Sequence, residues 1–346
     1  MMRVAVATVK VPFIRGGAER LAEGLVCAMQ RAGIEAEMVS TPFQFHPPSA
    51  VRSSMNVWSR EDFERFACGQ IDKVICLKFP TYYLQHPNKT VWLLHQHRAV
   101  YEFFDTPFGE SSGNIEASAL RENIIRCDQE ALTDSEAIFT ISKRVSARLW
   151  QYNGITSCPI YHPPPAAERF FSGAQLPYIF FPSRLEMLKR QDLLIRAMAK
   201  VRTPVMALIA GEGRFGATLE ALIAELGLEK RVRLIGRVTE EEIVDLYAHS
   251  LGVFFGPIDE DLGYVTLEAM LSSKPVITCS DSGGPTEFVI DAETGFIAQA
   301  NPEAVAEAVD FLWRNRDLAR RLGENGRARY EELNISWGNV VQSLLA

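Results

Sequence analysis

The chain of 346 residues is 47% hydrophobic and 23% charged, and its formal net charge at pH 7 is −7. This length suffices for two domains of about 150 residues, each with a hydrophobic core of its own. The acidic balance, without a dense basic run, excludes non-specific DNA or RNA binding from the expected functions. No apolar stretch approaches the roughly 18–20 residues of a membrane span, so we expect a cytoplasmic protein that works in solution or at the inner face of the membrane.

Buried strands alternate with helices along residues 1–165. Residues 3–9 (RVAVATV) predict a first strand, the loop after it contains Gly16 and Gly17, and an amphipathic helix follows from about 18 to 32. Further strands are expected at 35–40, 73–79, 90–95 and 137–142, and further helices at 115–132 and 143–152. This alternation predicts a mostly parallel α/β sheet.

Three prolines, Pro163–Pro165, and a polar stretch after them interrupt the pattern. We therefore expect an N-terminal domain at 1–165, a linker at 166–176 and a C-terminal domain at 177–330, with a last helix at about 331–346 completing the first domain. Within the C-terminal domain, strands are expected at 178–183, 205–211, 232–236, 251–256, 275–279 and 295–299, with helices between them. The prediction is an α/β protein of two tandem Rossmann-like, doubly wound domains facing a central cleft, with ligands at the carboxyl ends of the strands.

Six cysteines are scattered along the chain without a C-x-x-C pair: Cys27, Cys68, Cys76, Cys127, Cys158 and Cys279. Most of them stand among apolar residues, as in KVICLKF and PVITCS. We expect reduced, buried thiols rather than disulfides or zinc ligands.

The stretch VMALIAGEGRFGATLEALIAELG predicts strand, glycine turn and helix. Gly211, Gly213 and Gly216 have the G-x-G-x-x-G spacing of a dinucleotide-binding turn. That interpretation also requires an acidic residue at the end of the next strand, whereas VRLIG ends in Gly236 and Arg237. A turn lining a nucleotide-sugar pocket is favoured, and a dinucleotide site or a tight turn without a ligand remain the alternatives.

A second series of motifs is more specific. Glu260 and Glu268 stand eight residues apart, with Gly263 between them and an apolar helix beginning just after it. Upstream, SRLEMLKRQDLLIRA carries Arg184 and Lys189 in an R-x4-K spacing, and IAGEGR, VRLIGRVTEEEIVDLYAHS and DSGGPTEFV complete the series. This series resembles the retaining glycosyltransferases of family 4, with their glycosyl transferases group 1 domain.

The resemblance covers roughly residues 177–300 closely and the N-terminal half loosely, through GGAERL, LLHQHR and FTISKRV. The chain departs from the family pattern at Leu262, where phenylalanine is more usual, and at Arg190, where glycine is more usual. The approach GPIDE is also shortened. None of these changes removes a charged group.

The resemblance implies a GT-B fold and a role for each matching residue. A nucleotide-diphosphate sugar leaves as a diphosphate, whose charge requires fixed cations and amide donors, here Arg184, Lys189 and the start of the helix after Gly263. In the family, the second glutamate binds the nucleotide ribose and the first lies against the donor sugar. The catalytic residues expected are Arg184, Lys189, Glu260 and His95, and the donor-binding residues are Gly16, Gly17, Gly211, Gly213, Arg237, Val238, Gly263, Tyr264, Val265, Thr266 and Glu268.

His95 follows a predicted strand and matches the family position that faces the donor sugar, with His97 as the alternative. The glycines of the first loop would let it approach the diphosphate or the acceptor. Four arginines could contact a phosphorylated or lipid-linked acceptor: Arg15, Arg20, Arg121 and Arg144.

We therefore predict a metal-independent, retaining hexosyltransferase without a cofactor. Its partners would be a nucleotide-sugar donor and a hydroxyl acceptor, a growing polysaccharide or a lipid-linked oligosaccharide, with peripheral membrane contact through the N-terminal domain and no nucleic acid. A nucleotide-sugar epimerase and a non-catalytic sugar-nucleotide-binding protein remain alternatives. Residues 259–261 (Asp-Glu-Asp) also mimic a D-x-D metal site, which leaves a divalent metal as a further alternative.

Overall fold

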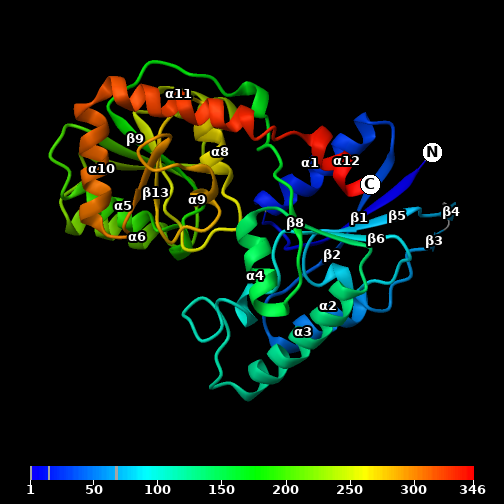
Figure 1. Cartoon of the computed structure of the whole chain (residues 1–346). Coiled ribbons are helices and arrows are strands. Elements are labelled where there is room, and N and C mark those ends of the chain that lie inside the picture. Colours follow the sequence, from blue (N-terminus) through cyan, green and yellow to red (C-terminus); the bar gives the residue numbers. More distant parts are fainter. Residues whose placement is uncertain (1, 15, 67–68) are drawn as a thin grey trace. The chain divides into compact units, whose positions relative to one another are not determined.

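The computed structural model describes residues 2–14, 16–66 and 69–346 (Figure 1). The chain divides into two compact units, which are residues 1–165 together with Ser336–Ala346, and Ala166–Ile335. Residues 166–176, expected as a linker, belong to the second unit. There the Gly173 amide donates to the Ala248 carbonyl at 2.9 Å, and the buried Lys274 ammonium donates to the Gly173 carbonyl at 3.0 Å.

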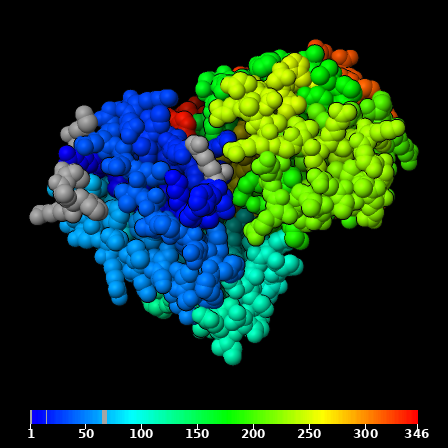
Figure 2. Space-filling model, turned by 180° about the vertical axis from the view of Figure 1, so that it is seen from behind, coloured from blue at the N-terminus to red at the C-terminus, as the bar shows by residue number. Residues whose placement is uncertain are grey.

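The N-terminal unit contains one parallel sheet of six strands flanked by helices (Figure 1). The strands lie in the order β2-β1-β5-β6-β7-β8, and their bounds are Arg3–Lys10 (β1), Glu35–Pro42 (β2), Lys73–Cys76 (β5), Lys89–Leu93 (β6), Ala137–Thr140 (β7) and Cys158–Pro159 (β8). Its helices are α1 (Gly17–Arg31), α2 (Pro48–Trp58), α3 (Ile115–Thr133), α4 (Lys143–Asn153) and α12 (Trp337–Leu345), and a short antiparallel hairpin joins β3 (Arg65–Phe66) to β4 (Gly69–Gln70). Much of the face of this unit seen in Figure 2 is formed by the early part of the chain, drawn in blue.

Helix α12 returns to the beginning of the chain and packs against α1 (Figure 1). The contact requires a glycine at position 24, because a Cβ there would lie 2.4 Å from the ring of Trp337. The same ring stacks on the buried His162 and meets Trp92 edge to face. The last residues of the chain are therefore part of the core of the N-terminal unit.

The C-terminal unit contains a second parallel sheet of six strands, again flanked by helices (Figure 1). The order is β11-β10-β9-β12-β13-β14, with bounds Tyr178–Pro182 (β9), Met206–Ala210 (β10), Val232–Gly236 (β11), Gly252–Phe254 (β12), Val276–Cys279 (β13) and Gly295–Ala298 (β14). The helices are α5 (Gln191–Met198), α6 (Gly216–Glu225), α7 (Glu240–His249), α8 (Tyr264–Leu271), α9 (Pro285–Phe288), α10 (Pro302–Arg314) and α11 (Arg316–Glu332). Strands β9, β10 and β11 thus follow one another toward one edge of the sheet, and β12, β13 and β14 follow one another toward the other edge.

The inner strands of this sheet are mainly apolar because helices cover both of its faces. All five residues of β9 are buried, and Ile179 and Phe181 pack with Ile209 and Phe254 in one hydrophobic core. Helices begin at sequence-coded caps, such as Thr239, whose hydroxyl accepts from the Glu242 amide while the Glu242 carboxylate accepts from the Thr239 amide.

The predicted fold class, α/β with two doubly wound parallel sheets, is confirmed. The expectation of buried thiols holds for Cys76 and Cys279 but is wrong for Cys27 and Cys158, which are exposed on α1 and β8. The buried residues of α1 are Leu21, Ala22, Leu25 and Met29, and Cys27 lies outside that set. Cys68 lies outside the described residues. Among the described residues, no helix combines the length and the apolarity that crossing a bilayer requires.

Candidate functional site

The candidate site lies in the C-terminal unit at the carboxyl ends of β9 and β12. The strand order reverses between these two neighbours, and ligands of doubly wound sheets bind beside such a reversal. The turn after β9 carries Arg184 and Lys189, and the loop after β12 carries Glu260 and Gly263. Two motifs far apart in sequence therefore leave the sheet from adjacent strands.

Lys189 and Glu260 form the central contact of this site. Lys189 ends a short 3₁₀ turn, η4 (Met187–Lys189), and its Nζ donates to Glu260 Oε2 at 2.6 Å. The ammonium also lies 5.7 Å from the centre of the Phe255 ring. The lysine and glutamate side chains are 15% and 23% exposed, so water screens their attraction only partly. The contact joins the R-x4-K turn directly to the E-x7-E loop.

Arg184 does not take part in this pair. Its Nη1 lies 2.9 Å from Glu186 Oε1 on the same turn, and its side chain is 51% exposed. The backbone at Arg184 is nevertheless fixed, because its carbonyl accepts a hydrogen bond from Gln191 Nε2 at 2.8 Å. The structure thus brings Lys189 and Glu260 together and leaves the guanidinium of Arg184 accessible beside its own turn.

The loop after β13 runs alongside Glu260. The Glu260 amide donates to the Ser282 carbonyl at 2.9 Å, and the Gly284 amide donates to the Glu260 carbonyl at 2.8 Å. Gly283 has φ +70°, and a Cβ there would lie 2.6 Å from the Glu260 carbonyl oxygen. Only glycine allows so close an approach of two backbone segments.

Helix α8 begins at the end of the same loop. Its N-cap, Gly263, has φ +90°, and a Cβ there would lie 2.8 Å from the Phe255 ring and 3.1 Å from Pro285. The predicted residues Tyr264, Val265 and Thr266 form the first turn of this helix. The amides of a first helical turn lack partners four residues back and carry the positive end of the helix dipole, so this end favours an anion.

Glu268 is buried on α8 rather than exposed on its surface. The residue is 9% exposed, and its Oε2 accepts a hydrogen bond of 2.6 Å from the hydroxyl of Tyr247 on α7. Burial and the neighbouring carboxylate raise the pKa of Tyr247, so the phenol keeps its proton and donates. Two residues earlier, the hydroxyl of Thr266 is buried without a hydrogen-bond partner among the described residues.

The glycine turn after β10 packs against the R-x4-K turn. A Cβ at Gly211 would lie 2.0 Å from the Ser183 carbonyl oxygen, and one at Gly213 would lie 2.3 Å from the Leu185 carbonyl oxygen. The packing of two backbone segments therefore requires glycine at 211 and 213, whereas a Cβ at Gly216 would lie 3.5 Å from Leu185 Cδ1, an ordinary contact. Arg237 and Val238 follow β11, which is an edge strand of the sheet. Arg237 is exposed and Val238 is half-buried.

The predicted residues of the N-terminal unit lie at the amino end of α1 and after β6. Gly16 is the N-cap of α1, which starts at Gly17, and its amide donates to Glu19 Oε2 at 2.8 Å. Glu19 in turn lies 3.5 Å from the ammonium of Lys78. Burial lowers the pKa of Lys78, and the Glu19 carboxylate opposes that shift.

The two histidines after β6 differ in their surroundings. His95 is half-buried, and its Nδ1 lies 2.7 Å from the Gln96 carbonyl oxygen. His97 is 3% exposed and stacks on Phe79 and Phe45. Burial lowers the pKa of His97 to about 3, so this ring is neutral at physiological pH. His95 is therefore the better placed of the two to meet a ligand.

Among the four arginines considered for the acceptor, Arg121 packs within the N-terminal unit. Arg121 donates to the Val100 carbonyl at 2.9 Å and lies over the ring of Phe104, which is a packing role. Arg15 lies outside the described residues. In the part of the chain described, no group of three or more His, Cys, Asp or Glu side chains could hold a metal ion.

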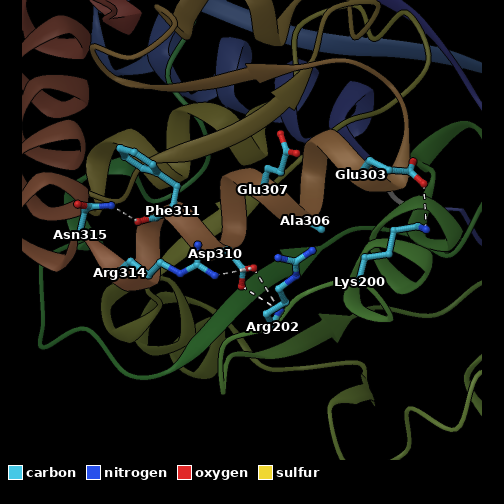
Figure 3. A pocket seen from close by; sticks show the side chains of 9 residues that line it. All are labelled: Lys200, Arg202, Glu303, Ala306, Glu307, Asp310, Phe311, Arg314 and Asn315. Carbon is cyan, nitrogen blue, oxygen red and sulfur yellow. Dashed lines mark hydrogen bonds and ion pairs between the residues drawn. The ribbon is translucent and has the colours of Figure 1, made fainter.

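A pocket of about 750 Å³ lies elsewhere in the C-terminal unit, between α10 and the loop from α5 to β10 (Figure 3). That loop leads into the amino end of β10, whereas the candidate site lies at the carboxyl ends of the strands. Charged side chains that line the pocket form ion pairs with one another, such as Lys200 with Glu303 and Arg314 with Asp310. Asp310 also accepts from the amides of Arg202 and Thr203, which ties the loop to the helix.

Residues 167–329 match the family model for glycosyl transferases group 1. The chain contains a glycosyltransferase domain of this family. The predicted resemblance is confirmed for this domain, which holds the whole of the candidate site in the C-terminal unit.

Curated glycosyltransferases are similar to parts of this chain. D-inositol 3-phosphate glycosyltransferase of Nocardia farcinica is 33% identical over 181 residues, which are 49% of this chain and 39% of that protein. The mouse alpha-1,3/1,6-mannosyltransferase ALG2 is 24% identical over 297 residues, covering 79% of this chain and 70% of the relative. The chain spans about two fifths of the length of the first curated relatives that it matches.

Solved glycosyltransferase structures share the fold of the whole chain. Sucrose-phosphate synthase from Thermosynechococcus elongatus has a TM-score of 0.79 at 18% identity, covering 99% of this chain and 97% of its own. Anabaena Alr3699/HepE in complex with UDP and glucose has a TM-score of 0.73 at 17% identity, covering 100% and 98%. Both have the GT-B fold of two Rossmann-like domains, as this chain does.

Two of the residues that organise the site were not predicted as such. Asp281, in the DSGGP loop, binds the side chain of Arg190, which the sequence marks only as a departure from the family pattern. Tyr247, in the middle of α7, binds Glu268. The signal for Asp281 was its partner Arg190, an unusual residue at a position where the family favours glycine. The sequence offers no signal for Tyr247.

Proposed function

We propose that this protein transfers a glycosyl unit from a nucleotide-diphosphate sugar to a hydroxyl acceptor, with retention of anomeric configuration. The observation that carries the proposal is the meeting of Lys189, Glu260 and the amino end of α8 at the carboxyl ends of β9 and β12. Cations and amide donors gathered at one point suit a leaving group whose negative charge grows as the bond breaks.

Lys189 would bind the departing pyrophosphate, and Arg184 would add a second cation. In the structure the Lys189 ammonium is held by Glu260 at 2.6 Å, whereas Arg184 is half exposed and paired only within its own turn. A donor would therefore exchange the bond between lysine and glutamate for two new ones. The phosphate would take the ammonium, and a sugar hydroxyl would donate to the carboxylate of Glu260.

Glu268 would bind the ribose of the donor nucleotide. Its carboxylate is oriented by the Tyr247 hydroxyl, which occupies Oε2. Gly236, Arg237 and Val238 at the end of β11 would lie beside the base, and the turn containing Gly211 and Gly213 would form a wall of the same pocket.

Retention requires no nucleophilic side chain in this scheme. The acceptor hydroxyl would attack on the face from which the pyrophosphate departs, and the leaving phosphate oxygen would accept its proton. The charge of the leaving group would be neutralised by Lys189, Arg184 and the helix amides rather than by a divalent metal, so the reaction would be metal-independent.

The N-terminal unit would bind the acceptor, with Gly16 and Gly17 near the diphosphate or acceptor and His95 facing the donor sugar. Relatives that match this chain include a D-rhamnosyltransferase of Pseudomonas aeruginosa and a GDP-mannose-dependent mannosyltransferase of Mycolicibacterium smegmatis that acts on a phosphatidylinositol mannoside. They support a hexosyl donor and a saccharide or lipid-linked saccharide acceptor. A cytoplasmic location with peripheral membrane contact follows as part of the proposal.

The test begins with a thermal-shift screen of UDP-, GDP-, ADP- and CMP-sugars, because a ligand that binds only the folded state raises the melting temperature. The donor found is then incubated with saccharide acceptors, and release of nucleoside diphosphate and the anomeric configuration of the product are measured by NMR. The proposal predicts transfer with retention that EDTA does not abolish. Isomerised sugar nucleotide in the absence of acceptor would identify an epimerase, and inversion or dependence on manganese would contradict the mechanism.

A further inference from the structure

Arg190 adopts a backbone conformation that glycine favours. It directly follows Lys189, has φ +55° and ψ +43°, and stands at the amino end of α5. A residue with a Cβ is strained in this left-handed region. Such strain persists only where the surrounding structure enforces it, and it is often found where a side chain has a function.

The side chain of Arg190 is held by Asp281 through two parallel hydrogen bonds. Nη1 donates to Oδ1 at 2.7 Å and Nη2 donates to Oδ2 at 2.5 Å. The arginine side chain is 18% exposed and the aspartate side chain 48%, so the arginine is largely withdrawn from solvent and its partner is not. A bidentate pair of this kind fixes orientation as well as distance, which a lysine in the same place would not do.

This pair closes a ring of contacts around the candidate site. Asp281 is followed by Ser282, whose carbonyl accepts from the Glu260 amide at 2.9 Å. The Glu260 carboxylate binds Lys189, which is followed by Arg190, and Arg190 binds Asp281 again. The ring links the turn after β9, the loop after β12 and the loop after β13.

We infer that Arg190 and Asp281 are positioning residues for the proposed glycosyl transfer, on which this inference rests. They hold the Lys189 ammonium in register with Glu260 and with the amino end of α8, and neither of them contacts the donor. Displacing a catalytic group by about 1 Å can lower a rate by about 10²-fold. Loss of the pair is therefore expected to act on kcat more than on the KM for the donor.

The test compares Arg190→Gly, Asp281→Asn, the double variant and Arg190→Lys with the wild-type chain. Arg190→Gly removes the side chain and its backbone strain together, so folding is expected to survive, with a melting temperature within about 3 °C of wild type. Ala292→Gly is the matched control, because Ala292 also has a positive φ, of 58°, and is exposed away from the site. The readouts are kcat, the donor KM, and hydrogen exchange at the amides of Glu260 and Gly284.

Both single variants and the double variant are expected to lose about tenfold in kcat, with the donor KM within about twofold of wild type and Arg190→Lys recovering part of the loss. Exchange at the two amides is expected to accelerate in the same variants and to stay unchanged in Ala292→Gly. Wild-type kcat in Arg190→Gly would overturn the inference. A loss in Arg190→Gly with full activity in Asp281→Asn would also overturn it, since Arg190 would then act on the donor directly.

If the wild-type chain transfers no sugar with any donor, the proposed function fails, and the exchange rates then decide the positioning role alone. Faster exchange at Glu260 and Gly284 in both single variants would uphold the ring of contacts, and unchanged exchange would refute it.

Discussion

Replacing Gly263 with alanine is expected to destabilise the C-terminal unit by about 3 kcal/mol. The residue has φ +90°, and the left-handed region costs a residue with a Cβ roughly 1–2 kcal/mol. The added Cβ would also lie 2.8 Å from the Phe255 ring. That ring is 2% exposed and packs against Phe181, so it has little room to move, and overpacking of this kind costs about 1–3 kcal/mol.

Gly227→Ala is the matched control for this prediction. Gly227 has φ +65° after α6, but no atom lies within 4 Å of the position where its Cβ would stand. Its replacement should therefore cost only the backbone strain, about 1 kcal/mol. Urea unfolding followed by circular dichroism measures both variants, and equal midpoints for the two would refute the close packing described at the amino end of α8.

Three further predictions concern buried carboxylates. Asp128 is buried on α3, and burial raises the pKa of its carboxyl group from 3.8 to about 6. The protonated carboxyl group therefore contributes its full stability below pH 3.8, and this contribution is lost as the pH rises through 6. Urea unfolding should show that the wild type loses about 2 kcal/mol relative to Asp128→Asn between pH 4 and 7. Tyr247→Phe should leave the Glu268 carboxylate without its hydroxyl donor, lowering the free energy of unfolding by about 1–3 kcal/mol and raising the donor KM in steady-state assays. Asp310→Ala should cost about 2–3 kcal/mol in the same unfolding assay, because the amide and hydroxyl of Thr203 lose their acceptor, whereas Asp310→Asn should cost less.

The strands and most helices could be predicted because the information for them is local. A strand covered on both faces is a run of apolar residues, as in β9, and helix α7 begins at a capping box that four consecutive residues encode. The positions of the motif residues at strand ends follow from the same alternation, since all parallel strands present their carboxyl ends at one edge of the sheet.

The contacts within the site could not be predicted because they join distant segments. Helix α5 begins at Gln191, directly after Arg190, and the side chain of Arg190 binds Asp281, 91 residues later. Glu268 was predicted to bind the donor, but nothing in the sequence indicated that Tyr247 on α7 would bind its carboxylate. Helical periodicity gives the face on which a side chain lies, but the tertiary fold decides what covers that face.

The hydrogen bond between Lys189 and Glu260 could not be predicted from the sequence either. Each residue was expected to meet the donor, and the spacing of the motifs gave no reason to pair them with each other. Pairing with the nearest carboxylate limits the cost of leaving a partly buried ammonium unpaired.

The central claim is that Lys189 and the amino end of α8 receive the pyrophosphate of a sugar nucleotide. Isothermal titration of wild type and Lys189→Met with a nucleoside diphosphate, and with the corresponding nucleoside, tests it most directly. If Lys189 binds the pyrophosphate, Lys189→Met should bind the nucleoside diphosphate at least about tenfold more weakly than the wild type, a loss of about 1.4 kcal/mol. The nucleoside should bind both proteins equally. Equal affinity of the two proteins for the diphosphate would contradict the central claim.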